Sequence, residues 1–294
     1  MTRHVVTGVD GSPSSEAAAH WAAGEAQRRG APLRLLHAWP WLSPVDAEAP
    51  GDFRPGDLRQ AALRMLSGIA GSIRRNHPGL VVETMVVGDD PVDALVKAAE
   101  GQELLVLGSR GLGGFAGLLT GSVTLAVAAR VTTPVVLVRA NRPASPQNGT
   151  TSRGEIVVGV DPRQPADAVI DFAFAEATRR GACLRAVHGW DPVPLWAATS
   201  WVPPRSEIAA REAAVKRLLT ESLATARAAH PDVPALLEVR HGSAAHAVVT
   251  AGEGADLVIV GRRDRHHPLG IRLGPVTHTV LHHAAAPVAV VPHS

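Results

Sequence analysis

The sequence predicts an α/β protein made of two tandem doubly wound domains, because the chain repeats itself and each half alternates apolar segments with amphipathic ones. Residues 4–10 read His-Val-Val-Thr-Gly-Val-Asp, and residues 156–161 read Ile-Val-Val-Gly-Val-Asp. Later in each half, Leu-Val-Leu-Gly at 105–108 returns as Val-Ile-Val-Gly at 258–261. The offsets are 151 and 153 residues, so a whole domain is duplicated rather than a short solenoid unit.

Length and composition fit this division. At 294 residues, two domains of about 145 residues each are close to the usual domain size. A polar segment with proline and glycine separates the copies, so we expect domain 1 at 1–140, a linker at 141–154 and domain 2 at 155–294. Hydrophobic residues make up 46% and charged residues 19%, as in ordinary globular chains.

Several protein classes are not expected. The chain has no apolar run of about 18 residues and no signal-peptide pattern at its start, so we expect neither a membrane span nor export. Its one cysteine, Cys183, cannot form an internal disulfide, which favours a cytoplasmic protein, and it falls in an apolar strand, which predicts a core residue. The net charge is +2 and no basic patch interleaves with aromatics, so nucleic acid is not an expected partner.

The helices and strands of the first half are predicted from the spacing of apolar residues and from the residues that begin or end a helix. The first strand is expected at 4–9, and a helix at 14–29 that Ser14 or Ser15 can cap and that Gly30 ends. A strand at 33–38 precedes a loop rich in tryptophan and proline and a long helix at 57–76. The remaining elements are strands at 81–87, 103–107 and 135–138 and helices at 91–100 and 121–130.

This βα alternation predicts a five-stranded parallel sheet with helices on both faces in each domain, a Rossmann-like fold of strand order 3-2-1-4-5. In that order, strands 1 and 4 flank the point where the chain direction across the sheet reverses. Ligands bind at the carboxyl ends of such strands. We therefore expect the segments that follow strands 1 and 4 to form one site.

Both of those segments are polar and rich in glycine in the first half. Residues 8–12 read Gly-Val-Asp-Gly-Ser, and a glycine-rich loop runs from Gly108 to Ser122. Gly108 and Gly111 would let the backbone approach a phosphate, Arg110 would add positive charge, and Gly121-Ser122 begins a helix whose amino end suits an anion. A flexible turn followed by a helix cap explains the glycines equally well, and no Walker A lysine follows them.

The spacing Gly108-x2-Gly111-x9-Gly121-Ser122, together with Asp10 and the strand after Pro134, resembles the nucleotide-binding pattern of the universal stress protein family. The resemblance covers essentially the whole chain, twice, and implies an ATP-binding, cytoplasmic regulator of the stress or dormancy response, with or without Mg²⁺. It implies that a defined set of residues binds the nucleotide: Val9, Asp10, Gly11, Ala38, Gly108, Arg110, Gly111, Gly121, Ser122 and Val123. An Asx-turn after the first strand is the alternative role for Asp10.

The second half departs from that pattern. Asp264 stands at the position of the second glycine, and Pro275 at the position of the serine. A carboxylate repels phosphate, and proline removes an N–H group and a hydroxyl, so we expect a weaker second site made by Asp161, Gly261 and Gly274. Arginines at 262, 263, 265 and 272 would attract an anion there or simply be exposed.

No catalytic or metal site is evident from the sequence. His278, His282 and His283 have helical spacing, which is typical of a solvated helix face and less often of a zinc site. At most weak ATP hydrolysis is expected. One alternative to ATP-dependent regulation is a slow ATPase or autophosphorylating enzyme of the adenine nucleotide hydrolase-like group. Ser122 would then be the nucleophile, although a role as helix cap explains this residue equally well. The other alternative is a dimerisation module that binds no nucleotide.

The assembly is expected to be an intramolecular pseudo-dimer. The fifth strands of both halves, 135–138 and 288–291, are short and apolar, and an unpaired edge of that kind favours pairing with another strand. The family resemblance implies the same arrangement. Association of two whole chains into a homodimer is a further expectation.

Overall fold

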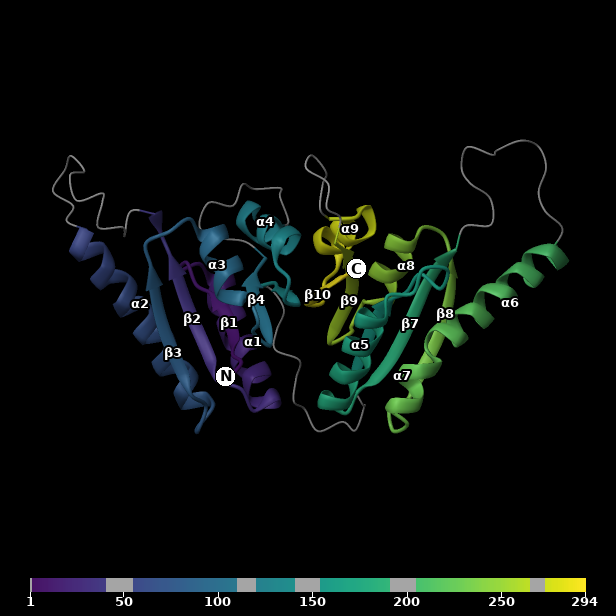
Figure 1. The fold of residues 1–294 in the computed structure, drawn as a ribbon, viewed down its shortest axis with the longest axis horizontal. Helices are drawn as coiled ribbons and strands as arrows, with labels where there is room; N and C mark the ends of the chain where they lie inside the picture. Colours follow the sequence, from purple (N-terminus) through teal and green to yellow (C-terminus); the bar gives the residue numbers. More distant parts are fainter. Residues whose placement is uncertain (1, 41–54, 110–119, 141–153, 191–204, 265–272) are drawn as a thin grey trace. The chain divides into compact units, whose positions relative to one another are not determined.

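The computed structural model describes residues 2–40, 55–109, 120–140, 154–190, 205–264 and 273–294. The chain divides into two compact units, Met1–Arg142 and Pro143–Ser294. Each unit is an open parallel sheet covered by helices (Figure 1).

Unit 1 alternates strands and helices along its whole described length. Its elements are β1 (Val5–Gly8), α1 (Pro13–Arg29), β2 (Leu33–Ala38), α2 (Pro55–Asn76), β3 (Val82–Val87), α3 (Pro91–Ala99), β4 (Leu104–Gly108), α4 (Ser122–Arg130) and β5 (Val135–Val138). The strand order is β3-β2-β1-β4-β5 and the pairs are parallel, which confirms the predicted order. The chain moves one way through α1 and α2 and back through α3 and α4, so right-handed crossovers put these two helix pairs on opposite faces.

Unit 2 repeats this topology with strand order β8-β7-β6-β9-β10. Its elements are β6 (Glu155–Gly159), α5 (Asp167–Arg180), β7 (Cys183–Trp190), α6 (Arg205–Ser222), α7 (Ala224–Ala229), β8 (Ala235–His241), α8 (Ala244–Ala251), β9 (Leu257–Arg263), α9 (Pro275–His283) and β10 (Val288–His293). The counterpart of α2 is divided into α6 and α7. In addition, β9 and β10 run further than β4 and β5, and α5 begins later than α1.

The core of each unit is the sheet itself. In β4 and β5 every residue is buried, and in β9 and β10 the first four residues are. Strands that are apolar on both faces are typical of a parallel sheet between two helix layers. None of the helices in the described part of the chain combines the length and apolar character needed to cross a bilayer.

The start of α1 differs from the prediction. Ser12 is the N-cap, and its Oγ accepts a hydrogen bond from the Ser15 amide at 3.1 Å, whereas Ser14 and Ser15 lie inside the first turn. Gly11 has φ +84°, which turns the chain early enough for Pro13 to begin the helix. The predicted end is confirmed, because Gly30 is a left-handed C-cap with φ 61°.

The expectation that Cys183 belongs to the core is wrong. Cys183 is the first residue of β7 and is half-buried. It pairs in register with Glu155 at the start of β6, so it lies at the amino edge of the sheet rather than at its centre.

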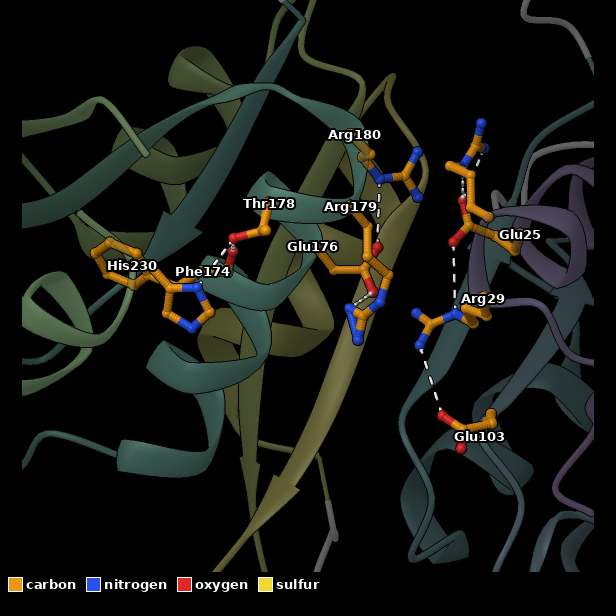
Figure 2. Close-up of polar contacts among 10 residues, drawn as sticks. Glu25, Arg29, Glu103, Phe174, Glu176, Thr178, Arg179, Arg180 and His230 are labelled. Carbon is orange, nitrogen blue, oxygen red and sulfur yellow. Dashed lines mark hydrogen bonds and ion pairs between the residues drawn. The ribbon is translucent and has the colours of Figure 1, made fainter. Parts of the chain in front are cut away.

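A buried carboxylate closes the last turn of α1 and of α5 (Figure 2). The Glu25 side chain is 1% exposed, and its Oε1 accepts from Arg28 Nη2 at 2.8 Å. The Glu176 side chain is also 1% exposed and pairs with Arg179 at 3.2 Å and Arg180 at 3.3 Å. The repeated Glu-x-x-Arg-Arg-Gly sequence therefore makes the same ion-paired helix end in both units.

Removing one of these carboxylates should destabilise its own unit. A Glu25→Ala substitution removes the carboxylate that lies 3.7 Å from the guanidinium of Arg29, whose side chain is 5% exposed, and breaking a buried ion pair typically costs about 3 kcal/mol. Hydrogen exchange with mass spectrometry should show faster exchange in the strands of unit 1, while Glu176→Ala should act on unit 2 instead. Unchanged exchange in both variants would contradict a stabilising role for these ion pairs.

Candidate functional site

The segment after β1 forms a tight turn held by its own side chains. The Asp10 Oδ1 accepts from the Ser12 amide at 2.9 Å, which is the Asx-turn that the sequence left as an alternative. The Asp10 amide in turn donates to Ser15 Oγ at 3.3 Å. The turn therefore fixes the Asp10 side chain at the carboxyl edge of the sheet, and such a turn is compatible with a ligand contact through the same carboxylate.

The segment after β4 returns to the same edge. The Ser109 amide donates to the Val138 carbonyl at 2.8 Å, and the Gly121 amide donates to the Ser109 carbonyl at 2.7 Å. The second bond brings the start of α4 back to the end of β4. Because β1 and β4 are parallel neighbours, with Thr7 opposite Val106, the Asp10 turn and the start of α4 share one edge.

The remaining predicted residues of the first site have different environments. Val9 is 3% exposed, and its amide donates to the Leu36 carbonyl at 2.8 Å. Ala38 ends β2 opposite Val87, and the side chains of Ser122 and Val123 are exposed. Arg110 and Gly111 lie outside the described residues.

Gly108 has a packing role that the sequence interpretation did not anticipate. A Cβ at Gly108 would lie 2.7 Å from the Ser14 carbonyl carbon and 2.8 Å from its oxygen. The missing side chain therefore lets the first turn of α1 lie directly on β4. This packing accounts for glycine here without any ligand.

Ser122 does not cap its helix, contrary to one of the two roles proposed for it. Gly121 is the N-cap of α4 and has no side chain with which to bond the first amides. Its carbonyl accepts from the Leu125 amide at 3.1 Å, so the helix begins normally. The amino end of α4 therefore lies at the edge of the sheet without a side-chain cap, which is an arrangement that suits an anion.

Sequence reasoning missed two side chains that hold this edge in both units. The His37 Nδ1 lies 2.7 Å from the Val9 carbonyl oxygen, and the His188 Nδ1 lies 2.9 Å from that of Val160. Thr124 Oγ1 donates to the Gly108 carbonyl at 2.9 Å, as Thr277 Oγ1 does to Gly261 at 2.8 Å. A comparison of the two copies position by position would have found them, because both residue types recur at the repeat offset.

The second site keeps the turn, but the strand that leads into it is longer. Asp161 Oδ1 accepts from the Arg163 amide at 3.1 Å, as Asp10 does from Ser12. After Gly261 the chain continues as β9, with Arg262 opposite Pro292 and Arg263 opposite His293. The corresponding residues of unit 1 lie beyond the end of β4.

The charge of Asp264 does not act as the sequence suggested. Its Oδ1 lies 2.7 Å from Nη1 of Arg262, whose side chain is 4% exposed. The ion pair compensates the carboxylate, so it would repel phosphate much less than an isolated one. The structural difference between the two edges that the described residues show is therefore the longer strand rather than one charge. Gly274 is the N-cap of α9 and precedes Pro275 at the start of the helix, and a Cβ added at Gly274 would meet no described atom within 4 Å.

Other candidates carry no site within the described residues. The His278 and His282 rings contact each other with centroids 4.5 Å apart, and no described group of three or more His, Cys, Asp or Glu side chains is arranged to hold a metal ion. Trp39 is 46% exposed, while Trp190 is buried against the His241 ring. The other loop tryptophans, at 41, 196 and 201, lie outside the described residues.

Comparisons with known proteins agree with the fold and the duplication. The model of the universal stress protein family matches residues 1–139 and 153–292. Universal stress protein Rv2005c of Mycobacterium tuberculosis is 32% identical over 296 residues, which cover 97% of this chain and 96% of that protein.

A solved structure gives the same architecture. A universal stress protein from Archaeoglobus fulgidus has a TM-score of 0.68 at 17% identity, with 99% of this chain and 98% of that chain covered. Another structure from this organism, solved in complex with dAMP, covers 46% of this chain and 97% of its own at 28% identity and a TM-score of 0.35. The family model matches twice and nearly end to end, so this chain belongs to the universal stress protein family and carries two of its domains in tandem.

Proposed function

We propose that unit 1 binds ATP and that the chain acts as a nucleotide-dependent regulator of a stress or dormancy response in the cytoplasm. The observation that carries this proposal is the meeting of the Asp10 turn and the amino end of α4 at one edge of the sheet. The carboxylate of Asp10 would accept hydrogen bonds from ribose hydroxyls. The first amides of α4 would donate to the phosphates.

The fit to a phosphate rests on the start of α4. The Gly121–Ser109 bond fixes where the helix begins, Gly121 provides no cap, and Ser122 and Val123 are exposed. An anion there would gain hydrogen bonds from backbone groups that the protein holds in place, together with the favourable end of the helix dipole. Any Mg²⁺ would be held mainly through the phosphates, as is usual for this ion.

Regulation is favoured over catalysis by the groups around this edge. The hydroxyl at the start of α4 is that of the exposed Ser122, and among the described residues no basic side chain forms a hydrogen bond with it. Phosphate transfer needs such positioning groups. We therefore expect at most slow hydrolysis of bound ATP.

Replacing Gly121 tests the proposed phosphate contact. Gly121 has φ −73° and ψ 152°, an extended conformation that valine readily adopts, so a Gly121→Val variant should fold. Its branched side chain would obstruct the close approach of the phosphates. ATP affinity measured by isothermal titration calorimetry should fall at least tenfold, equivalent to about 1.4 kcal/mol.

The matched control is Gly274→Val in unit 2, where the N-cap has φ −67° and ψ 159°. This variant should leave tight ATP binding unchanged. Unchanged affinity in a folded Gly121→Val protein would remove the start of α4 from the site.

We also propose that the two units associate through their fifth strands as a pseudo-dimer. All four residues of β5 are buried, and the equivalent strand β10 is buried over its first four. Residues 1–142 and 143–294, produced as separate chains and mixed, should form a complex in analytical ultracentrifugation. Two halves that fold but neither self-associate nor bind each other would refute this assembly.

A further inference from the structure

The outer strand of unit 2, β8, has one edge that no other strand of the described residues pairs with. β8 is the first strand in the order β8-β7-β6-β9-β10 and pairs on its other side with β7. Every residue of β8 is exposed or half-buried, and Leu236 is 56% exposed. On α6, the helix that packs on β8, Leu218 is 40% exposed. An edge that lies beside exposed apolar side chains is suited to pairing with another strand.

The backbone groups of β8 that face this edge belong to alternate residues. The Leu184 amide of β7 donates to the Pro234 carbonyl at 2.9 Å, and the Gly242 amide donates to the Trp190 carbonyl at 3.0 Å. Because the residues of a paired parallel strand turn alternately toward and away from the neighbouring strand, the even-numbered residues of β8 bond to β7. The outward N–H and C=O groups therefore belong to the odd-numbered residues, which are Ala235, Leu237, Val239 and His241.

The first of these outward carbonyls already has a partner within unit 2. Arg227 Nη2 donates to the Ala235 carbonyl at 3.4 Å. Unit 1 has the same arrangement 153 residues earlier, where Arg74 Nη2 donates to the Val82 carbonyl at 2.7 Å. An arginine thus protects the amino end of both outer strands. A strand that pairs with β8 is therefore expected to use the residues that follow Ala235.

Glu238 and Arg240 place opposite charges on one face of β8, since alternate residues of a strand share a face. The Glu238 carboxylate accepts from Arg240 Nε at 2.5 Å and from Arg185 Nη1 at 3.3 Å. Arg185 also donates to Glu155 at 2.7 Å, so it bridges two carboxylates. A guanidinium has five N–H donors, so Arg240 can bind a carboxylate of another chain in addition to Glu238.

We propose that the chain forms a homodimer through β8, with the two copies of β8 antiparallel about a two-fold axis at Val239. Val239 would lie opposite Val239 of the second copy, and Leu237 opposite His241, so that outward backbone groups meet outward backbone groups. Glu238 would lie opposite Arg240 of the second copy, and the two-fold axis forms this ion pair twice. The edge would thus be complementary to itself in both hydrogen bonding and charge.

The other registers of the two strands are less favourable. A two-fold axis at Glu238 or at Arg240 would set like charges directly opposite each other, which is destabilising. An axis at Leu237 would place no residue of β8 opposite Arg240, and it would need the Ala235 carbonyl. That carbonyl already bonds to Arg227. Axes nearer either end shorten the overlap, so the charges and the protected amino end select the same register.

The outer strand of unit 1 lacks this complementarity, so the dimer is expected to form through unit 2. The outward residues of β3 are the even-numbered ones, as the bond from Arg74 to the Val82 carbonyl indicates. A two-fold axis at Thr84 would set Glu83 opposite Met85, so no ion pair would form. It would also need the Val82 carbonyl that Arg74 already binds.

Sedimentation velocity of the full chain over a range of concentrations tests this dimer through two charge reversals. Glu238→Arg and Arg240→Glu each set like charges opposite each other in both symmetric pairs. Each variant alone should therefore dimerise at least tenfold more weakly than the wild-type chain. In an equimolar mixture the two arginines of one variant meet the two glutamates of the other. The mixture should regain the dimer, which would also show that both variants fold.

A second pair of variants tests the backbone hydrogen bonds. Val239→Pro removes an amide that points away from β7, and an edge strand tolerates proline at such a position. The dimer should weaken at least tenfold, because the two-fold axis removes a bond from each copy. Val86→Pro is the matched control, since Val86 has the equivalent outward position in β3 and should leave the dimer unchanged.

Three results would overturn the proposal. The first is a wild-type chain that stays monomeric. The second is a dimer that Val239→Pro and both charge reversals leave unchanged, or that Val86→Pro weakens as much as Val239→Pro does, because the interface would then lie elsewhere. The third is a mixture of the folded charge variants that does not regain the dimer. If the charge variants fail to fold, the two proline variants decide the question.

Discussion

One ATP is expected to bind tightly per chain, in unit 1, with a second ATP bound at least 100-fold more weakly. The physical reason is the backbone after the fourth strand. In unit 1 the chain leaves β4 at Ser109 and returns at Gly121, whereas in unit 2 Arg262 and Arg263 extend β9 and pair with β10. Losing two hydrogen bonds to a charged phosphate costs about 3 kcal/mol or more, which corresponds to a factor of about 100.

The stoichiometry can be measured by isothermal titration calorimetry, and paired variants assign the site. Asp10→Asn should lower tight ATP binding at least tenfold, while Asp161→Asn should leave it unchanged. Both substitutions preserve an oxygen acceptor for the turn that each aspartate makes, with Ser12 and with Arg163. Two equivalent ATP molecules per chain would overturn the asymmetry, and the reverse ranking of the variants would mean that the two sites are assigned the wrong way round.

The duplication made the fold predictable from the sequence. Apolar strands that alternate with capped helices predict a parallel sheet, and the strand order 3-2-1-4-5 is present in both units. Gly30 and Gly181 both end their helices in the left-handed conformation that glycine favours. Local signals and tertiary structure agree at these positions.

The site was less predictable where pairing with a neighbouring strand outweighs the local preference of the residues. The sequence Gly-Arg-Arg-Asp at 261–264 is polar and predicts a loop, yet Arg262 and Arg263 extend β9 because Pro292 and His293 pair with them. The late start of α5 has a local signal that was overlooked. Pro165 disfavours helical backbone at Gln164, and the helix begins two residues after the proline, at Asp167.

The two roles of Gly108, packing and ligand approach, could not be separated by sequence alone. Glycine at the end of a strand suits a phosphate, but it also suits a helix that lies on the strand. Only the placement of Ser14 shows that the helix occupies this space. Gly261 is the equivalent glycine of unit 2 and serves as a control for Gly108, because the atoms nearest to it belong to side chains rather than to backbone.

A Gly108→Ala substitution should destabilise unit 1 by about 2–3 kcal/mol, the upper part of the range for overpacking. The added methyl group would lie 2.7 Å from the Ser14 backbone, which cannot move without displacing the first turn of α1 and the Ser12 cap. Gly261→Ala is the matched control. The atoms nearest its methyl group would belong to the His293 and Val169 side chains, at 3.0 and 3.1 Å, and these side chains can shift, so a cost below about 1 kcal/mol is expected.

Hydrogen exchange with mass spectrometry separates the two units in the intact chain, because peptides from β4 and β9 report on each sheet independently. Protection should fall in β4 of the Gly108→Ala protein and remain near the wild-type level in β9 of the Gly261→Ala protein. ATP binding should weaken together with β4 protection, since the displaced turn also carries Asp10. Equal effects of the two substitutions would mean that α1 is not firmly packed on β4. In that case glycine at position 108 would have to be explained by the ligand.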